Sequence, residues 1–168
     1  MTNASVRHIF IAPFAGEPMQ EVQEVFAIAG VGLVGDRYAC KRGIFSSLRK
    51  TACRHATLIS LEALELANAQ LPVPFLPSET RRNIIIEGIS AQELNDLSAG
   101  KPFRIGAALV RGVELCDPCS HPSKLSGKPG FKKAFRNRGG LRIKILRSGQ
   151  IKTGDELVYE QNLHPTLF

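Results

Sequence analysis

The sequence has no apolar run that approaches the roughly 20 residues that a membrane-spanning helix requires. Its first residues also lack the basic stretch and the long apolar stretch that are typical of a secretory signal peptide. We therefore expect a cytoplasmic protein that has no membrane partner. In that compartment its four cysteines should be reduced thiols rather than a disulfide framework.

Acidic residues are missing from one long segment of the chain. Between Pro118 and Gly154 the sequence carries ten Lys or Arg residues and no Asp or Glu. The whole chain has a formal net charge of +7 at pH 7. Such an excess favours an anionic partner, which could be nucleic acid, a phosphorylated cofactor or an acidic protein.

No linker, internal repeat or low-complexity run interrupts the chain, and residues 1–168 suit a single domain with its own core. Alternating or β-branched apolar segments bounded by Gly and Pro predict about eight strands. The clearest of these are residues 7–12, 21–29, 56–59, 84–86, 102–105, 107–115, 141–146 and 156–159. With no repeated βα units, this pattern predicts a mainly β fold, a compact β-barrel with two or three short helices.

Local signals place the expected helices. Ser60 is a good N-cap for one helix, and Ser90 forms a capping box with Glu93 at the start of another. A helical turn is expected over residues 131–136. Residues 120–130 are rich in Pro and Gly, so we expect a flexible loop there.

The main candidate for chemistry is the stretch GVELCDPCSHP at residues 112–122. It places two thiols, Cys116 and Cys119, close together, with His121 immediately after them. A cysteine reacts as its thiolate, which nearby cations and a histidinium stabilise. The basic segment downstream would supply those cations, so Cys119 is the candidate for a reactive thiol. The alternative is that both cysteines are small buried hydrophobic residues at the end of a strand.

Two other interpretations of the cysteine pair remain open. A thioredoxin-type redox couple needs its motif at the start of a helix in a βαβ unit, and Pro118 and Pro122 disfavour a continuous helix here. A zinc site is also conceivable, although strong zinc signals show two close pairs and this sequence shows one. The side chains that a zinc site could use are Cys40, Cys53, Cys116, Cys119, His55 and His121.

Arg81-Arg82-Asn83 opens the strand expected at residues 84–86. Guanidinium groups bind phosphate or carboxylate in bidentate fashion, so this stretch could clamp an anion. A solvated strand edge is the alternative. Upstream, the glycines of residues 30–35 match a dinucleotide-binding spacing, but the helix and the acidic residue that such a site needs are missing. We interpret this stretch as a glycine-rich loop in which Asp36 and Arg37 form a fixed charge pair, and both are candidate cofactor-binding residues.

Nucleic-acid binding has little support in the basic segment. Aromatic residues interleave with its cations only as Phe131 and Phe135, which is a sparse stacking surface. A basic RNA-binding β-barrel without enzymatic activity remains an alternative, and nucleic acid is not the expected partner.

Several short motifs occur in a characteristic order. They are VRHI at 6–9, GEPM at 16–19, GVGLVGDRY at 30–38, RRNI at 81–84, residues 97–106, CDPC at 116–119, GGLR at 139–142 and GQIKTGD at 149–155. This ordered set resembles the MOSC domain, named for the C-terminal part of molybdenum-cofactor sulfurases, in its small stand-alone bacterial form. The resemblance covers roughly residues 5 to 160.

The resemblance implies a strand-rich barrel and a functional cysteine at Cys119. Stand-alone members are proposed sulfur carriers that accept sulfur from a pyridoxal-phosphate-dependent cysteine desulfurase and deliver it to a metal–sulfur centre or to the molybdenum cofactor. The pyridoxal phosphate would belong to that partner enzyme.

Relatives in the amidoxime-reducing group instead bind the molybdenum cofactor, use this cysteine as a metal ligand and reduce N-hydroxylated compounds. On either implication, Cys116 would be a resolving or supporting thiol, and Arg81, Arg82 and Asn83 would position the anion.

Overall fold

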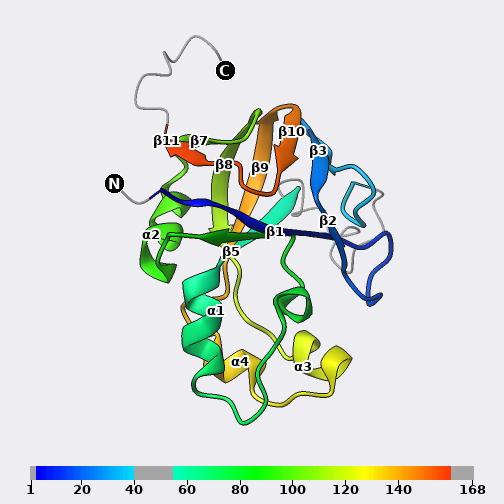
Figure 1. Cartoon of the computed structure of the whole chain (residues 1–168), viewed down its shortest axis with the longest axis vertical. Coiled ribbons are helices and arrows are strands. Elements are labelled where there is room, and N and C mark those ends of the chain that lie inside the picture. Colours follow the sequence, from blue (N-terminus) through cyan, green and yellow to red (C-terminus); the bar gives the residue numbers. More distant parts are fainter. Residues whose placement is uncertain (1–2, 40–54, 160–168) are drawn as a thin grey trace.

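The computed structural model describes residues 3–39 and 55–159, and the statements that follow concern these residues. Short strands are its commonest elements (Figure 1). The strands are β1 (Ser5–Ile11), β2 (Gln20–Val22), β3 (Glu24–Ile28), β4 (Gly32–Leu33), β5 (Ala56–Ser60), β6 (Ile84–Glu87), β7 (Pro102–Ile105), β8 (Ala108–Leu115), β9 (Leu141–Arg147), β10 (Gly149–Lys152) and β11 (Leu157–Tyr159). The helices are α1 (Leu61–Asn68), α2 (Ala91–Asp96), α3 (His121–Ser126) and α4 (Phe131–Ala134), with 3-10 helices η2 (Pro77–Thr80) and η3 (Leu97–Ala99).

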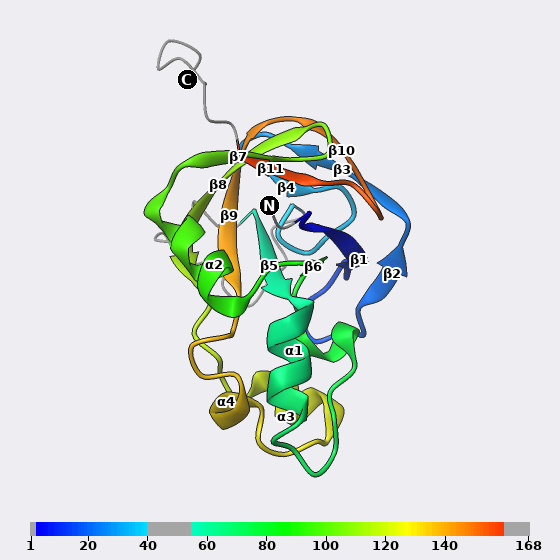
Figure 2. The ribbon, with the colours of Figure 1, turned by 60° about the vertical axis from the view of Figure 1, so that its left-hand side comes forward.

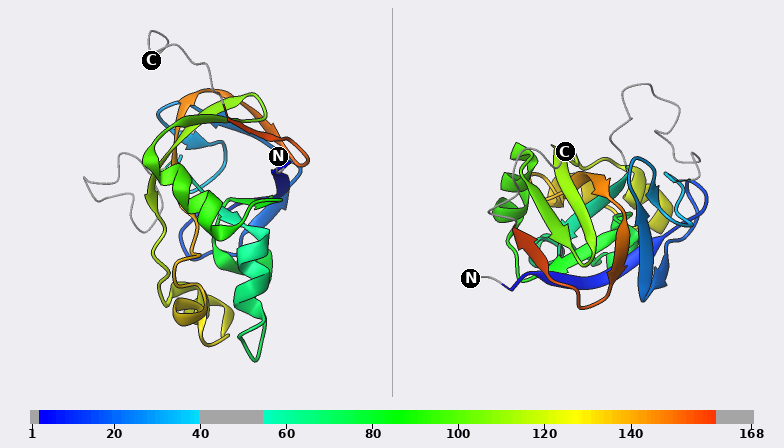
Figure 3. Two further views of the ribbon diagram at one scale, coloured as in Figure 1. Left: turned by 90° about the vertical axis from the view of Figure 1, so that its left-hand side faces the viewer. Right: turned by 90° about the horizontal axis from the view of Figure 1, so that it is seen from above.

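Eight strands form one sheet in the order β11-β7-β8-β9-β5-β6-β1-β2, and β10, β3 and β4 form a smaller sheet. Neighbouring strands are antiparallel except β5 and β6, which are parallel because α1 and η2 form the crossover between them. The large sheet curls strongly (Figure 3), and β1 meets the residues just before β11, where Ser5 pairs with Glu156 in an isolated bridge. No continuous strand ladder closes the ring within the described residues. The mainly β class and the short helices are therefore confirmed, but the sheet is curled and open rather than a closed barrel.

The central strand β6 is buried on both faces. Ile84 and Ile86 belong to the core that the curled sheet encloses, whereas Ile85 belongs to a second core beneath the helices. Full burial of one such side chain stabilises the fold by about 1.5–3 kcal/mol. This double burial explains why residues 84–86 are uniformly apolar, without the alternation of a strand that faces solvent on one side.

Helices α1, α3 and α4 gather at one end of the molecule, beyond the strands (Figures 1 and 2). Their core contains Phe75, Phe131 and Phe135, and the rings of Phe131 and Phe135 stack with centroids 4.1 Å apart. Both rings are fully buried, so they do not offer a stacking surface to nucleic acid. None of the helices in the described ranges is long and apolar enough to cross a membrane.

The helix starts follow local sequence signals with one exception. Ser60 accepts a hydrogen bond from Ala63 N, and Ser90 and Glu93 form the expected capping box, so both predictions are confirmed. The expected flexible loop at residues 120–130 is wrong, because it contains α3. Pro122 lies in the first turn of α3, where a missing N–H disrupts no helical hydrogen bond.

Candidate functional site

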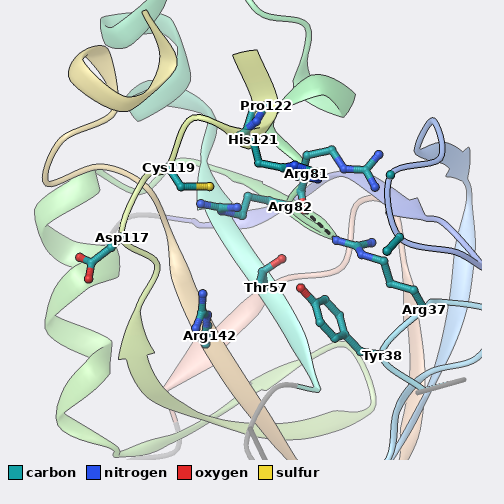
Figure 4. A pocket seen from close by; sticks show the side chains of 12 residues that line it. Arg37, Tyr38, Thr57, Arg81, Arg82, Asp117, Cys119, His121, Pro122 and Arg142 are labelled. Carbon is teal, nitrogen blue, oxygen red and sulfur yellow. Dashed lines mark hydrogen bonds between the residues drawn. The ribbon is translucent and has the colours of Figure 1, made fainter. Parts of the chain in front are cut away.

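A cavity of about 210 Å³ lies between the curled sheet and α3 (Figure 4). Segments far apart in the sequence line it: the β1–β2 loop, the loop after β4, the strands β5 and β9, the residues before β6, and the β8–α3 connection. The lining residues are Ala15, Gly16, Arg37, Tyr38, Thr57, Arg81, Arg82, Asp117, Cys119, His121, Pro122 and Arg142.

The two cysteines of the motif have different environments. Cys119 is exposed and lines the cavity, whereas Cys116 is 3% exposed and is not part of the lining. The backbone N of Cys116 donates to the carbonyl of Gly140 at 2.8 Å, which ties the start of the loop to β9. The sequence left two interpretations open, a reactive thiol or a small buried hydrophobic residue. Cys116 is buried, as the second interpretation expects, whereas Cys119 is accessible, as the first requires.

Two consecutive glycines allow this loop to approach the sheet. A Cβ at Gly139 would lie 2.2 Å from the carbonyl oxygen of Cys116, and a Cβ at Gly140 would lie 2.1 Å from that of Leu58. Any side chain at either position would push these backbones apart. The pair therefore fixes where the loop leaves β8 and, with it, where Cys119 lies.

Four arginines line the cavity together with Cys119, and two of them have carboxylate partners. Arg37 pairs with the buried Asp36 at 3.2 Å, which confirms the predicted fixed charge pair, and Arg142 pairs with Glu114 at 2.8 Å. A third acidic side chain near the cavity belongs to Asp117, and in Figure 4 its carboxylate points away from the guanidinium groups.

Arg81 and Arg82 have no carboxylate partner among the described residues. The guanidinium of Arg81 donates to the carbonyl of Glu17, and Nε of Arg82 donates to that of Gly139 at 2.7 Å. Figure 4 shows the guanidinium of Arg82 and the sulfur of Cys119 pointing toward one another, with Arg81 directed to the β1–β2 loop. Since carbonyl groups carry only partial charge, these two cations are the ones left for an external anion.

Arg81 is held in an unusual backbone conformation. Its φ of 65° is left-handed, which a residue with a side chain adopts at a cost of about 1–2 kcal/mol. Arg37 stabilises this conformation because its guanidinium donates to the carbonyl of Arg81 at 3.3 Å. Strain of this kind is often retained where it positions a functional group. Here it directs the Arg81 side chain toward the β1–β2 loop at the edge of the cavity.

The concentration of positive charge changes proton equilibria in the cavity. Burial, followed by the neighbouring Arg37, lowers the pKa of Arg81 to about 10. Burial also lowers the pKa of His121, with further contributions from Arg81, Arg37 and Lys124. His121 is consequently less readily protonated than an ordinary histidine, which favours its neutral form.

Asn83 holds the backbone beneath the cavity in place through buried hydrogen bonds. It is completely buried, its side-chain oxygen accepts hydrogen bonds from the N and Oγ1 of Thr57, and its amide donates to Phe10 O at 3.1 Å. Thr57 itself lines the cavity. Asn83 and Asp36 therefore lie outside the lining, although both were predicted to bind the ligand, and they hold residues that do line it.

Of the predicted site residues, the structure brings Cys119, His121, Arg37, Arg81 and Arg82 to one cavity. Sequence reasoning did not single out four further polar lining residues, Tyr38, Thr57, Asp117 and Arg142. Three of these, Tyr38, Asp117 and Arg142, belong to the motifs GDRY, CDPC and GGLR, so the motifs could have indicated them as site residues. Thr57 had none, because it lies within an ordinary apolar strand.

The zinc interpretation gains no geometric support from residues 3–39 and 55–159, where no three His, Cys, Asp or Glu side chains converge as metal ligands. His55 is buried, and its Nδ1 accepts a hydrogen bond from Ile145 N at 2.9 Å. Cys40 and Cys53 lie outside the described residues.

A sequence model of the MOSC domain matches residues 44–158. Solved structures of similar fold include the YuaD protein from Bacillus subtilis, with a TM-score of 0.77, 19% identity and coverage of 94% of this chain and 97% of that one. YiiM from Geobacillus stearothermophilus gives a TM-score of 0.68 at 17% identity, covering 94% of this chain and 75% of that one. YiiM from Escherichia coli gives 0.63 at 16% identity, with coverage of 94% and 71%. A comparison with curated protein sequences finds no match. At these identities the solved structures establish the fold alone.

Proposed function

The chain belongs to the MOSC domain family, and we propose that it is a sulfur carrier in which Cys119 holds a sulfane sulfur atom as a persulfide. The observation that carries this proposal is the exposed thiol of Cys119 in a cavity that it shares with four arginines and a neutral histidine. A buried thiol such as Cys116 could not meet a sulfur donor in this way.

The transfer is a thiol exchange that needs no external oxidant. The thiolate of Cys119 attacks the outer sulfur of a donor persulfide, a new S–S bond forms, the S–S bond of the donor breaks, and the donor leaves as a thiolate. Delivery repeats the exchange with a nucleophile of the acceptor, which restores Cys119 as a thiolate. Atoms and electrons balance in each step.

The neighbouring side chains fit these steps. Neutral His121 is able to take the thiol proton of Cys119, and Arg82, which faces the sulfur, stabilises the negative charge of the thiolate and of the persulfide (Figure 4). The donor that suits this chemistry is a pyridoxal-phosphate-dependent cysteine desulfurase. The acceptor is a metal–sulfur centre or the molybdenum cofactor, where a thiol reductant would supply the two electrons that convert the transferred sulfane sulfur to sulfide and would itself be oxidised to a disulfide.

Intact-mass analysis tests the proposal. After incubation with L-cysteine and a cysteine desulfurase, the wild-type chain should gain about 32 Da, the mass of one sulfur atom. Cys119→Ala should gain nothing. Cys116→Ser is the matched control and should still gain the sulfur, because Cys116 does not line the cavity. Equal uptake by Cys119→Ala and wild type would refute the proposal.

A second candidate, binding of the molybdenum cofactor, is favoured by Arg81 and Arg82, for which residues 3–39 and 55–159 supply no carboxylate partner. Their charge fits the phosphate of a pterin cofactor, and the exposed thiol of Cys119 is a suitable ligand for a soft metal. Arg81 and Arg82 would hold the phosphate, and Cys119 would bind molybdenum. The bound group would supply the electrons for reducing N-hydroxylated compounds. Elemental analysis of protein from a host that makes the cofactor should then show molybdenum in wild type and none in Cys119→Ala.

A further inference from the structure

A second cavity, of about 300 Å³, adjoins the thiol cavity. The two share three wall residues, Gly16, Arg81 and Pro122, so they lie directly beside one another. The remaining walls come from η2, α3 and the β1–β2 loop. We call this second cavity the η2–α3 groove.

Exposed aliphatic side chains line the η2–α3 groove. Leu76 is 59% exposed and Leu125 is 44% exposed, and both border the groove together with Met19. The groove contains no aromatic side chain. Leucines exposed at this level within a concave surface offer apolar area that a partner's aliphatic side chain would remove from water.

The surroundings of the groove are positively charged. Arg81, which has no carboxylate partner among the described residues, lies at the junction with the thiol cavity. The acidic group of the groove wall, Glu79, is already neutralised by Lys128 at 2.6 Å. The exposed cations Lys124 and Lys132 belong to the same helical end of the molecule, in a segment without any acidic residue.

We propose, on the basis of the sulfur-carrier function above, that the η2–α3 groove is the docking site for the protein that exchanges sulfur with Cys119. That protein would insert an extended acidic segment, with a carboxylate on Arg81 and an aliphatic side chain against Leu76 and Leu125. The segment would bring its persulfide past Arg81, which borders both cavities, to the thiol. A protein fits better than nucleic acid, because bases need aromatic surfaces and Phe131 and Phe135 are fully buried.

Synthetic persulfide peptides test the proposal with a defined probe. The first peptide carries one leucine flanked by glutamates and ends in a cysteine persulfide, and the second has lysines in place of the glutamates. The measurement is the rate of sulfur loading on Cys119 from each peptide, divided by the rate from free cysteine persulfide. The acidic peptide should exceed the lysine peptide about tenfold at low salt, and the preference should shrink as salt screens the charges.

Three leucine variants locate the docking site. Leu76→Gln and Leu125→Gln should each lower the ratio for the acidic peptide about fivefold, as expected for the loss of one half-buried apolar contact. Leu66→Gln is the matched control, because Leu66 is 58% exposed on α1 and does not line the groove. The proposal is overturned if the acidic peptide has no advantage, or if Leu66→Gln lowers the ratio as much as the groove variants.

A binding measurement separates this proposal from the sulfur-carrier function. An unreactive peptide with serine in place of the cysteine persulfide should bind, by fluorescence anisotropy, in a manner that depends on Leu125. If it binds in this way while no donor loads Cys119, the carrier function fails and the docking site stands. If single-stranded oligouridylate displaces the peptide and binds Leu125→Gln as tightly as wild type, the surface recognises nucleic acid and the docking proposal fails.

Discussion

Replacing Gly139 with alanine should displace the thiol of Cys119 while leaving the chain folded. The new Cβ would lie 2.2 Å from the carbonyl oxygen of Cys116 and 3.2 Å from Cδ of Pro118. Non-bonded carbon atoms pack at about 3.5 Å or more, so β9 and the loop must separate by about 1 Å. The φ of Gly139 is not positive, so the penalty is steric and includes no backbone strain.

The expected magnitude follows from that displacement. Overpacking of this kind costs about 1–3 kcal/mol, which in a chain of this length lowers the Tm by about 2–4 °C for each kcal/mol. The same shift moves the Gly139 carbonyl, which accepts the 2.7 Å hydrogen bond from Arg82. A misplacement of about 1 Å in a reacting centre reduces rates by about 100-fold, and we expect a loss of this order in sulfur loading of Cys119.

Thermal unfolding and intact-mass kinetics, measured on the same preparation, provide the assay. Gly127→Ala is the control, because its φ of 72° imposes strain but a Cβ there meets no atom within 4 Å. It should lower the Tm by a similar amount and leave loading close to wild type. Normal loading by Gly139→Ala would refute the positioning argument, as would equal losses in the two variants.

Three further outcomes are expected. Arg81→Asn should raise the Tm of the protein by about 2–4 °C and abolish binding of the acidic peptide, because asparagine tolerates the left-handed φ and the change removes a buried cation that no carboxylate of the described residues pairs with. A fall in Tm would contradict this. Because burial and Arg81 lower the pKa of His121, sulfur loading of Cys119 should persist at pH 6.5 and decline only when the pH falls below the lowered pKa of His121. In a pH–rate profile, His121→Gln should abolish this decline. Asn83→Ala should cost about 2–4 kcal/mol in urea unfolding, because Thr57 N and Phe10 O lose their buried partner; a cost below about 1 kcal/mol would show that water replaces it.

The sequence predicts those parts of the fold that local chemistry determines. The alternation at residues 141–146 places Leu141, Ile143 and Ile145 in the core, as the structure confirms. What it could not predict depends on long-range geometry. Whether the sheet closes depends on how β1 pairs with the residues before β11. An isolated bridge between Ser5 and Glu156 joins them, and no local sequence pattern predicts such a bridge. Helix α3 was missed because proline and glycine favour both loops and helix ends.

The candidate site shows the same division. The cations near Cys119 could be anticipated from motifs, but not which of them lack a carboxylate partner. That distinction depends on Asp36 being beside Arg37 and on Glu114 pairing with Arg142 across strands β8 and β9. Asn83 was assigned to ligand binding because it follows two arginines, whereas its hydrogen bonds to a neighbouring strand determine its position.

The charge balance of the cavity links the proposed chemistry to the proposed docking site. A thiolate at Cys119 carries one negative charge, and so does the persulfide that replaces it, so Arg82, which faces the sulfur, is balanced throughout the cycle (Figure 4). Arg81 points to the opposite side, and no carboxylate of the described residues would compensate its charge in either state. A buried charge without a partner lowers the stability of the fold. The presence of Arg81 at a strained backbone position is explained if an external carboxylate or phosphate pairs with its guanidinium. Arg81 borders the η2–α3 groove as well as the thiol cavity. A carboxylate of the docked partner would therefore neutralise Arg81 and reduce the positive charge around His121. That change would raise the pKa of His121, so docking would strengthen its affinity for the proton of Cys119.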